Sequence, residues 1–321
     1  MKVTIAFKDN KITYIRPIRL PAGELSTNVF SHLTLMDDES KSIDIFTLKG
    51  FYQTDLEEKK MAITHFFESH DFNFNRLVYH LPFFNSAQSP TAFCGEILFD
   101  IESALFPFIK YELPNSLVIQ SNSLGIEHLE NALCLKIKIS PDKSSLKELA
   151  TLVNKSSQGK TLPLLRLDGN RKFELHELVL FMNELNERVL ERIDYIEEPF
   201  KNFYDLYSFQ KIYPQKIAID ESLTFYQEHL DCLPFASPLI LKPALFGISK
   251  SFQLIRNASE LGHKVIVSST YQPGSTFFPL LALASYSDSF HKSPLFHGLD
   301  TLSFLPLLYQ NSLVLNSLSI N

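Results

Sequence analysis

The pattern of apolar and polar residues changes near residue 117, which predicts two regions of different structure. Before that point, short runs alternate apolar and polar residues at Lys11–Arg19 and Ser42–Leu48, as half-buried strands do. The sequence Thr54–Glu57 matches a capping box, and a second helix is predicted after the cap Ser89-Pro90. The first hundred residues are therefore predicted to form an α+β domain.

From about Leu117, short apolar strands alternate with helical stretches. The predicted strands are Leu117–Gln120, Leu133–Ile139, Leu162–Asp168, Ile193–Glu197, Ile217–Asp220, Leu239–Lys242, Lys264–Ser269 and Leu295–Leu299. The clearest predicted helices are Ser144–Asn154, Glu174–Arg192, Ile248–Leu261 and Phe277–Tyr286. This alternation predicts a (β/α)8-type barrel. The alternative is a doubly wound open sheet, but no glycine-rich turn follows the first strand.

Composition narrows the class of protein. Hydrophobic residues make up 45% and charged residues 21% of the 321 residues, which is typical of a folded globular chain. The net charge is -6 and no basic stripe is present, so we expect no nucleic-acid partner. No apolar run reaches the roughly 18–20 residues that cross a membrane, and the apolar run at the N-terminus is too short for a secretory signal. Three cysteines imply no disulfide framework, so a reduced, cytoplasmic protein is predicted.

Charged or polar residues follow six successive predicted strands. They are led by Lys138, Asp168, Glu197, Asp220, Lys242 and Ser268, which lie 22 to 30 residues apart. Each residue alone has an ordinary explanation, since a strand lysine is usually solvated and an acid after a strand often caps the next helix. Six such residues at the ends of six successive strands are harder to explain in that way. Catalytic groups of barrel enzymes sit at this end of the strands, so the set predicts an active site.

The residue types indicate the chemistry. Three carboxylates on adjacent strands form a hard oxygen site that suits Mg²⁺. A neutral lysine acts as a base, whereas a protonated one stabilises negative charge. Lys138 would lie near Lys136 and the metal, and these cations would lower its pKa. Proton abstraction from a carbon next to a carboxylate, through an enediolate, is therefore predicted.

Several short motifs together carry a resemblance to a known family. They are Arg166–Arg171, Ile196–Pro199, Asp220–Leu223, Leu241–Pro243, Val267–Ser269 and Gly298–Leu302. With Lys136 and Lys138, this set resembles the o-succinylbenzoate synthase family of the enolase superfamily, in its muconate-lactonizing branch, over residues 130–302. The resemblance implies a modified TIM barrel over 108–302. It also implies an α+β capping domain over 1–107 that the tail 303–321 completes.

The resemblance also implies roles for individual residues. Asp168, Glu197 and Asp220 correspond to the Mg²⁺ ligands, with Mn²⁺ able to take the place of Mg²⁺. Lys138 corresponds to the acid/base, and Lys242 to the lysine that stabilises the enediolate as a cation. Substrate-binding residues and residues that support the metal ligands are expected to be Lys136, Arg166, Asn170, Glu221, Ser268, Ser269 and Gly298. Of these, Ser268 and the Gly298 backbone would receive the succinyl carboxylate.

The implied activity is the syn dehydration of 2-succinyl-6-hydroxy-2,4-cyclohexadiene-1-carboxylate to o-succinylbenzoate in menaquinone biosynthesis. The partner is then a small-molecule carboxylate; the oligomeric state stays open. An N-acylamino-acid racemase of the same superfamily would use the same residues. A dipeptide epimerase is disfavoured because Asp300-Thr-Leu302 lacks a second acid. A barrel without catalysis is the alternative from another class.

Three departures from the family pattern concern the substrate pocket. A Gly-Glu-x-x-Pro stretch of the capping domain is replaced by Ile45–Phe51. Gln272 stands where relatives carry a glutamate, within the unusual segment Tyr271–Gly274. Arg16 and Arg19 are candidate carboxylate partners, although solvated side chains are the simpler expectation. The predicted metal site is unaffected.

Overall fold

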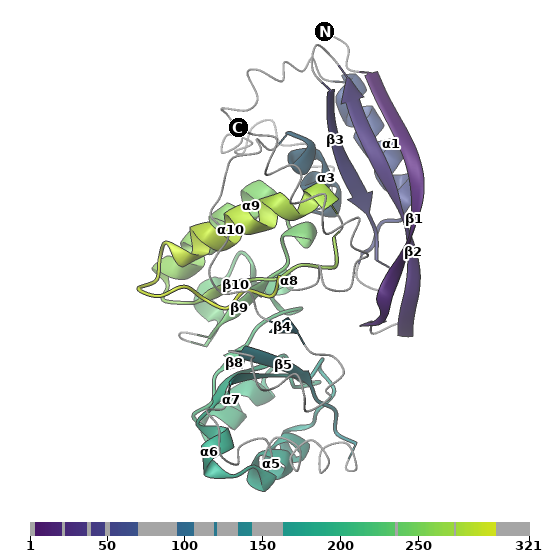
Figure 1. Cartoon of the computed structure of the whole chain (residues 1–321). Coiled ribbons are helices and arrows are strands. Elements are labelled where there is room, and N and C mark those ends of the chain that lie inside the picture. Colours follow the sequence, from purple (N-terminus) through teal and green to yellow (C-terminus); the bar gives the residue numbers. More distant parts are fainter. Residues whose placement is uncertain are drawn as a thin grey trace.

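The computed structural model describes most of both predicted regions (Figure 1). The residues described are 4–20, 23–36, 40–48, 52–69, 95–105, 119–120, 134–142, 163–234, 237–272 and 274–299. The predicted helix Ser144–Asn154, the start of the helix after Ser89, the 107/108 boundary and the tail 303–321 lie outside these ranges. Among the helices described, none has the length and apolar character needed to cross a membrane.

The N-terminal region contains an antiparallel sheet of β1 (Thr4–Leu20), β2 (Gly23–Met36) and β3 (Ser40–Phe46). Strand β2 was not predicted from the sequence. Its buried positions do not simply alternate, because the adjacent residues Phe30 and Ser31 are both buried. Phe30 packs in the cluster that contains Ile12, whereas Leu33 belongs to the main core.

Two helices pack near this sheet: α1 (Leu56–Ser69) and α3 (Gly95–Leu105). The predicted capping box was wrong by one residue. Asp55 and Glu58 form it, since each backbone N–H donates to the other's carboxylate at 2.9 Å. The Thr54 hydroxyl instead donates to Glu96 of α3 at 2.5 Å, which removes it from the box.

The second region is a series of parallel strands in chain order. They are β4 (Ile119–Gln120), β5 (Cys134–Lys138), β6 (Leu164–Asp168), β7 (Ile193–Glu197), β8 (Ile217–Ala218), β9 (Leu239–Leu241) and β10 (Val265–Val267). A bridge from Ile219 to Leu239 joins β8 to β9, and Ser268 pairs with Gly298 beyond β10. Because the order never reverses, the fold is the predicted barrel type and not a doubly wound sheet.

Helices follow the strands. They are α5 (Leu175–Glu184), α6 (Glu187–Leu190), α7 (Asp205–Gln210), α8 (Leu223–Tyr226), α9 (Ile248–Glu260) and α10 (Phe278–Asp288), with 3-10 turns η3 (Leu230–Cys232), η4 (Pro243–Leu245) and η5 (Gly274–Phe277). The single helix predicted over Glu174–Arg192 was wrong. Leu185 is extended, and Asn186 caps a new helix by accepting the Val189 N–H at 2.9 Å.

Hydrogen bonds of Glu102 and of Tyr52 tie the N-terminal region to the barrel. The buried Glu102 of α3 accepts hydrogen bonds from the backbone N–H groups of Ile248 and Ser249, at the start of α9. The Tyr52 hydroxyl lies 2.6 Å from the Thr270 hydroxyl, just after β10. Both ties lie close to strand ends, so they place the capping elements beside the carboxyl ends of the barrel strands.

Candidate active site

The three predicted metal ligands lie on neighbouring strands. Asp168 ends β6 and is the pairing partner of Glu197, which ends β7. Glu197 in turn pairs with Ala218, two residues before Asp220. All three side chains are buried, so three carboxylates share one poorly solvated region at the carboxyl ends of the strands.

Two lysines compensate this negative charge. Lys136 Nζ lies 3.1 Å from Asp168 Oδ2 and donates to Glu197 Oε1 at 2.7 Å. Lys242 Nζ, directly after β9, donates to Asp220 Oδ2 at 2.5 Å. Its distance to Glu221 Oε1 is 3.9 Å. Buried charges are tolerated when they are paired in this way.

Lys138 differs from the other two lysines. It ends β5, is paired in register with Asp168, and is more exposed than Lys136 and Lys242. Its pKa is lowered by desolvation and by repulsion from Lys136 and Lys242, while Asp168 acts in the opposite direction. Burial alone would lower the pKa of Lys242, but Asp220 and Glu221 outweigh it and raise this pKa. The two predicted catalytic lysines are thus shifted in opposite directions, toward a base and a permanent cation.

The carboxylates are shifted unequally as well. Burial raises the pKa of Asp220 to about 7, with Lys242 opposing and Glu197 reinforcing the shift. Burial also raises the pKa of Glu197, and Asp168 adds to this. For Asp168, burial is outweighed by Lys136 and Lys138, which lower its pKa. Mutual repulsion among the acids therefore persists despite the lysines.

This donor set fits a divalent cation in its chemistry. Mg²⁺ is bound by oxygen donors, and carboxylates are among its usual protein ligands. Glu197 Oε2 is buried and has no hydrogen-bond partner among the described residues, so this oxygen is available to bind a cation. The side chains are turned toward the lysines, however, and among the described residues no three His, Cys, Asp or Glu side chains already surround one point. Cation binding at these oxygens would therefore compete with Lys136 and Lys242.

Other predicted residues differ in how close they lie to this centre. Asn170 Nδ2 donates to Asp168 Oδ1 at 2.6 Å, so it orients that carboxylate. Arg166 lies two residues before Asp168 on the same side of β6. Its Nε donates to Asp194 Oδ2 at 2.9 Å and its Nη1 donates to the Phe296 carbonyl at 2.6 Å. These contacts hold Arg166 inside the barrel, below the strand ends, and its guanidinium reaches the segment that leads to Gly298.

The residues predicted to bind the succinyl carboxylate lie at the end of β10. Ser268 and Ser269 are buried directly after β10. The Gly298 N–H donates to the Val267 carbonyl at 2.8 Å, and its carbonyl accepts from Ser269 N at 3.0 Å. Both backbone groups of Gly298 therefore serve sheet pairing. A Cβ at this position would lie 2.8 Å from Ser268 Oγ, so glycine permits the close approach of the two strands.

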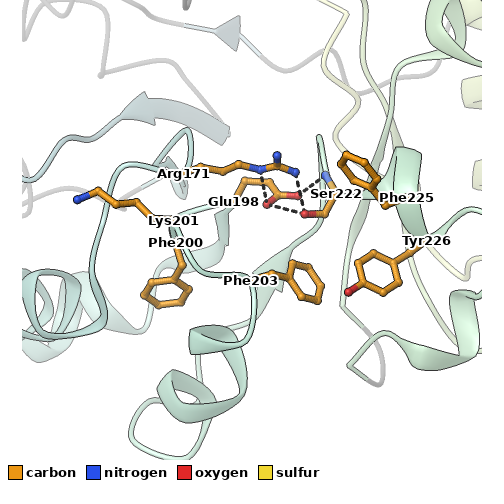
Figure 2. Close-up of a pocket in the computed structure, with 8 residues that line it drawn as sticks. All are labelled: Arg171, Glu198, Phe200, Lys201, Phe203, Ser222, Phe225 and Tyr226. Atoms are coloured by element: carbon orange, nitrogen blue, oxygen red, sulfur yellow. Dashed lines mark hydrogen bonds and ion pairs between the residues drawn. The ribbon is translucent and has the colours of Figure 1, made fainter.

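Two residues that the sequence analysis did not single out as site residues lie directly behind the carboxylates. Glu198 follows Glu197, and its buried carboxylate accepts from Arg171 Nε at 3.3 Å and from Ser222 N at 2.7 Å. A cavity of about 240 Å³ borders this pair; its other lining residues are Phe200, Lys201, Phe203, Ser222, Phe225 and Tyr226 (Figure 2). In the sequence, the motif Ile196–Pro199 contains the double acid Glu197-Glu198, but this does not reveal which way the Glu198 side chain points.

No protein-family model matches the chain. Curated relatives named o-succinylbenzoate synthase include one from Aliivibrio fischeri strain MJ11, 27% identical over 150 residues, covering 46% of this chain and 45% of that one. Another, from Haemophilus influenzae, is 30% identical over 142 residues, covering 44% and 42%. The match thus spans less than half of the length of these relatives.

Solved structures match over nearly the whole chain. An o-succinylbenzoate synthase from Thermosynechococcus elongatus BP-1, complexed with Mg in the active site, has a TM-score of 0.68 at 18% identity and covers 98% of this chain and 99% of its own. A dipeptide epimerase from Enterococcus faecalis V583, complexed with Mg and L-Leu-L-Tyr, has a TM-score of 0.74 at 13% identity, with coverage of 95% and 92%. A muconate lactonizing enzyme from Pseudomonas fluorescens has a TM-score of 0.69 at 14% identity, covering 94% and 88%. The chain therefore has the fold of these enzymes.

Proposed function

We propose that this chain, which has the enolase-superfamily fold and is similar in sequence to o-succinylbenzoate synthases, is a divalent-metal-dependent carbon–oxygen lyase that forms o-succinylbenzoate. The observation that carries the proposal is the grouping of Lys136, Asp168 and Glu197 with Asp220 and Lys242 at one end of the barrel. The sequence match to enzymes of that name supports the choice among activities of this fold.

Asp168, Glu197 and Asp220 would hold the cation. When bound, Mg²⁺ would supply positive charge to the substrate carboxylate and so stabilise the charge that develops during proton removal. We expect Mn²⁺ to substitute for Mg²⁺, because it also prefers oxygen ligands. Lys136 then keeps two of the three carboxylates compensated, and Asn170 fixes the orientation of Asp168.

The two remaining lysines divide the chemistry. Lys138, whose pKa is lowered, is assigned as the base that removes the proton next to the substrate carboxylate. The protonated Lys138 then returns that proton to the departing hydroxyl, which leaves as water and yields the aromatic product. Lys242, whose pKa is raised, stays cationic throughout and stabilises the electron-rich intermediate.

The test is dehydration of 2-succinyl-6-hydroxy-2,4-cyclohexadiene-1-carboxylate by the purified chain, followed as loss of diene absorbance. Lys138→Ala and Lys242→Ala are each expected to lower kcat by roughly 100-fold or more, because each removes a group that acts on the reacting atoms. Lys172→Ala, an exposed lysine, is the control and should retain activity. Full activity in either catalytic-lysine variant would contradict the assigned roles.

Racemisation of N-acylamino acids is the second candidate, because Lys138 ends β5 and Lys242 follows β9, and three strands of the barrel separate β5 from β9. Placed on opposite sides of an α-carbon, they could exchange its proton on either face. Exchange of that proton for deuterium in D₂O, without turnover of the diene, would favour this activity. If the chain shows neither turnover nor proton exchange, the remaining interpretation is a barrel without catalysis.

A further inference from the structure

Glu198 and Arg171 form a charged contact beside the cavity (Figure 2). Glu198 Oε1 accepts from the backbone N–H of Asp220 at 3.1 Å and of Ser222 at 2.7 Å. Its Oε2 accepts from Arg171 Nε at 3.3 Å and from the Ser222 hydroxyl at 3.2 Å. Arg171 Nη2 also donates to Ser222 Oγ at 2.8 Å, which closes the network. We call Glu198, Arg171 and Ser222 the clamp.

The clamp joins the three loops that carry the carboxylates. Arg171 lies three residues after Asp168, Glu198 is adjacent to Glu197, and Ser222 lies two residues after Asp220. A backbone hydrogen bond also connects two of these loops, since Arg171 N donates to the Glu198 carbonyl at 2.6 Å. A change in any one loop would therefore shift the spacing between ligands on different strands.

The backbone of these loops adopts a conformation that side chains rarely favour. Asn170, Arg171 and Glu198 have positive φ angles of 46°, 55° and 34°. Such conformations persist where the surroundings hold them in place, often at functional sites. At Glu198 this backbone directs the carboxylate away from Lys136, toward Ser222 and Arg171, while Glu197 points inward.

We propose that the clamp fixes the loops that carry Asp168, Glu197 and Asp220 relative to one another, and so sets the affinity of the chain for Mg²⁺. Glu198 and Arg171 are positioning residues that act through the ligands and do not touch the cation. This inference rests on the proposed function, because it assigns the three carboxylates to Mg²⁺. Outer partners of metal ligands commonly influence affinity in this way.

The charge of the clamp matters as well as its hydrogen bonds. The Glu198 side chain is 5% exposed, so its carboxylate depends on Arg171 for compensation. Glutamine at this position would keep an oxygen for the Asp220 and Ser222 N–H groups but would turn an amide toward Arg171. The Glu198→Gln variant therefore loses the charge pair with Arg171 but keeps the backbone contacts.

The cavity beside the clamp offers a direct test by chemical rescue. Arg171 lines the cavity of about 240 Å³ and its side chain is 36% exposed, so Arg171→Ala opens a space that connects with it. A free guanidinium ion is planar and donates to carboxylates as arginine does. It should therefore re-form the contacts with Glu198 and Ser222 in this variant.

The experiment measures Mg²⁺ affinity by titration calorimetry on the full chain, with Mn²⁺ affinity by electron paramagnetic resonance as a parallel readout. Arg171→Ala and Glu198→Gln are expected to bind either cation roughly 10- to 100-fold more weakly than the unmodified chain. Millimolar guanidinium chloride should restore affinity to Arg171→Ala but not to Glu198→Gln, while equal sodium chloride restores neither. Lys201→Ala is the matched control, since Lys201 lines the same cavity but pairs with the exposed Glu174.

The outcomes separate this inference from the function on which it rests. Unchanged affinity in both variants would overturn the clamp and leave the proposed metal site intact. Weakened binding in Arg171→Ala that guanidinium does not restore would indicate general damage to the fold, and would also overturn the proposal. Absence of Mg²⁺ binding by the unmodified chain would refute the proposed metal chemistry and the clamp together. Circular dichroism in the presence of EDTA checks that each variant is folded.

Discussion

At the scale of single residues, Lys136 carries the charge balance of the site. Its ammonium lies within 3.1 Å of two buried carboxylates, and these acids, with Asp220, outweigh burial and raise its pKa well above the ordinary value. Lys136→Met would leave Asp168 and Glu197 buried without their shared partner. Breaking a buried pair in this way typically costs about 3–5 kcal/mol.

We therefore expect urea unfolding in EDTA to show a loss of about 3 kcal/mol for Lys136→Met. Added Mg²⁺ should reduce the loss, because a cation bound to the same carboxylates replaces part of the missing charge. Lys172→Met, at an exposed position, should change stability by less than about 0.5 kcal/mol. A Lys136→Met variant as stable as the control would show that the acids do not depend on this lysine.

Residue types were more predictable than residue orientations. The alternation of Lys136 and Lys138 with apolar neighbours was enough to place both on one face of β5. The same reasoning could not predict that Glu198 turns away from Glu197, because that depends on a positive φ angle held by the adjacent loops. For Gly298, the sequence could not show that both its backbone groups are used in sheet pairing.

At the scale of elements, Glu102 connects helix α3 to helix α9. Its carboxylate accepts the first N–H groups of α9, from Ile248 and Ser249, across 146 and 147 residues of sequence. Glu102→Ala removes this cap and leaves buried N–H groups without a partner. We expect a loss of about 1–2 kcal/mol in the free energy of unfolding, measured by urea denaturation. Glu260→Ala, at the exposed far end of α9, should be nearly neutral.

The contact between α1 and α3 predicts a dependence on pH. Lys59 Nζ donates to Asp100 Oδ2 at 2.7 Å, yet burial raises the pKa of Asp100 from 3.8 to about 6, with Lys59 opposing the shift. The folded state therefore binds this proton more tightly than the unfolded chain does. The stabilisation is fully present below about pH 4 and is lost as pH rises through about 6.

Asp100→Asn isolates this effect, because asparagine resembles the protonated acid and does not titrate. Between pH 4 and pH 7, the unmodified chain should lose stability relative to Asp100→Asn, by an amount on the order of a few kcal/mol. Asp231→Asn, at an exposed position, should show no such trend. If the stability of the unmodified chain relative to Asp100→Asn instead stays constant or rises over this pH range, Lys59 keeps Asp100 ionised throughout.

Elements defined by buried apolar runs were predicted well. The strands β7 and β10, and the helices α9 and α10, lie close to their predicted ranges because their apolar residues face one core. The helix break at Leu185 was missed because Glu174–Arg192 keeps a helical pattern on both sides, and only the cap at Asn186 divides it. Strand β2 was missed because it buries residues on both faces.

At the scale of the whole molecule, the order of the parallel strands determines where the chemistry lies. Strands that pair in chain order bring residues 138, 168, 197, 220 and 242 to one end, although they are spread over about a hundred residues. This gathering could be predicted from spacing and residue type, since each βα unit returns the chain to the same end. The packing of Tyr271 against the sheet β1–β3 could not, because nothing in the local sequence specifies a contact at that distance.

The most direct test of the account is a titration of Mg²⁺ against the dehydration rate of the cyclohexadiene substrate, after removal of metal with EDTA. We expect no turnover without added metal, saturable recovery of o-succinylbenzoate formation with Mg²⁺, and no recovery at any Mg²⁺ concentration in Asp168→Asn. Turnover that persists in EDTA, or that Asp168→Asn retains in full, would contradict the assignment of these carboxylates to a catalytic metal. Mg²⁺ binding to the unmodified chain without turnover of this substrate would contradict the proposed activity itself.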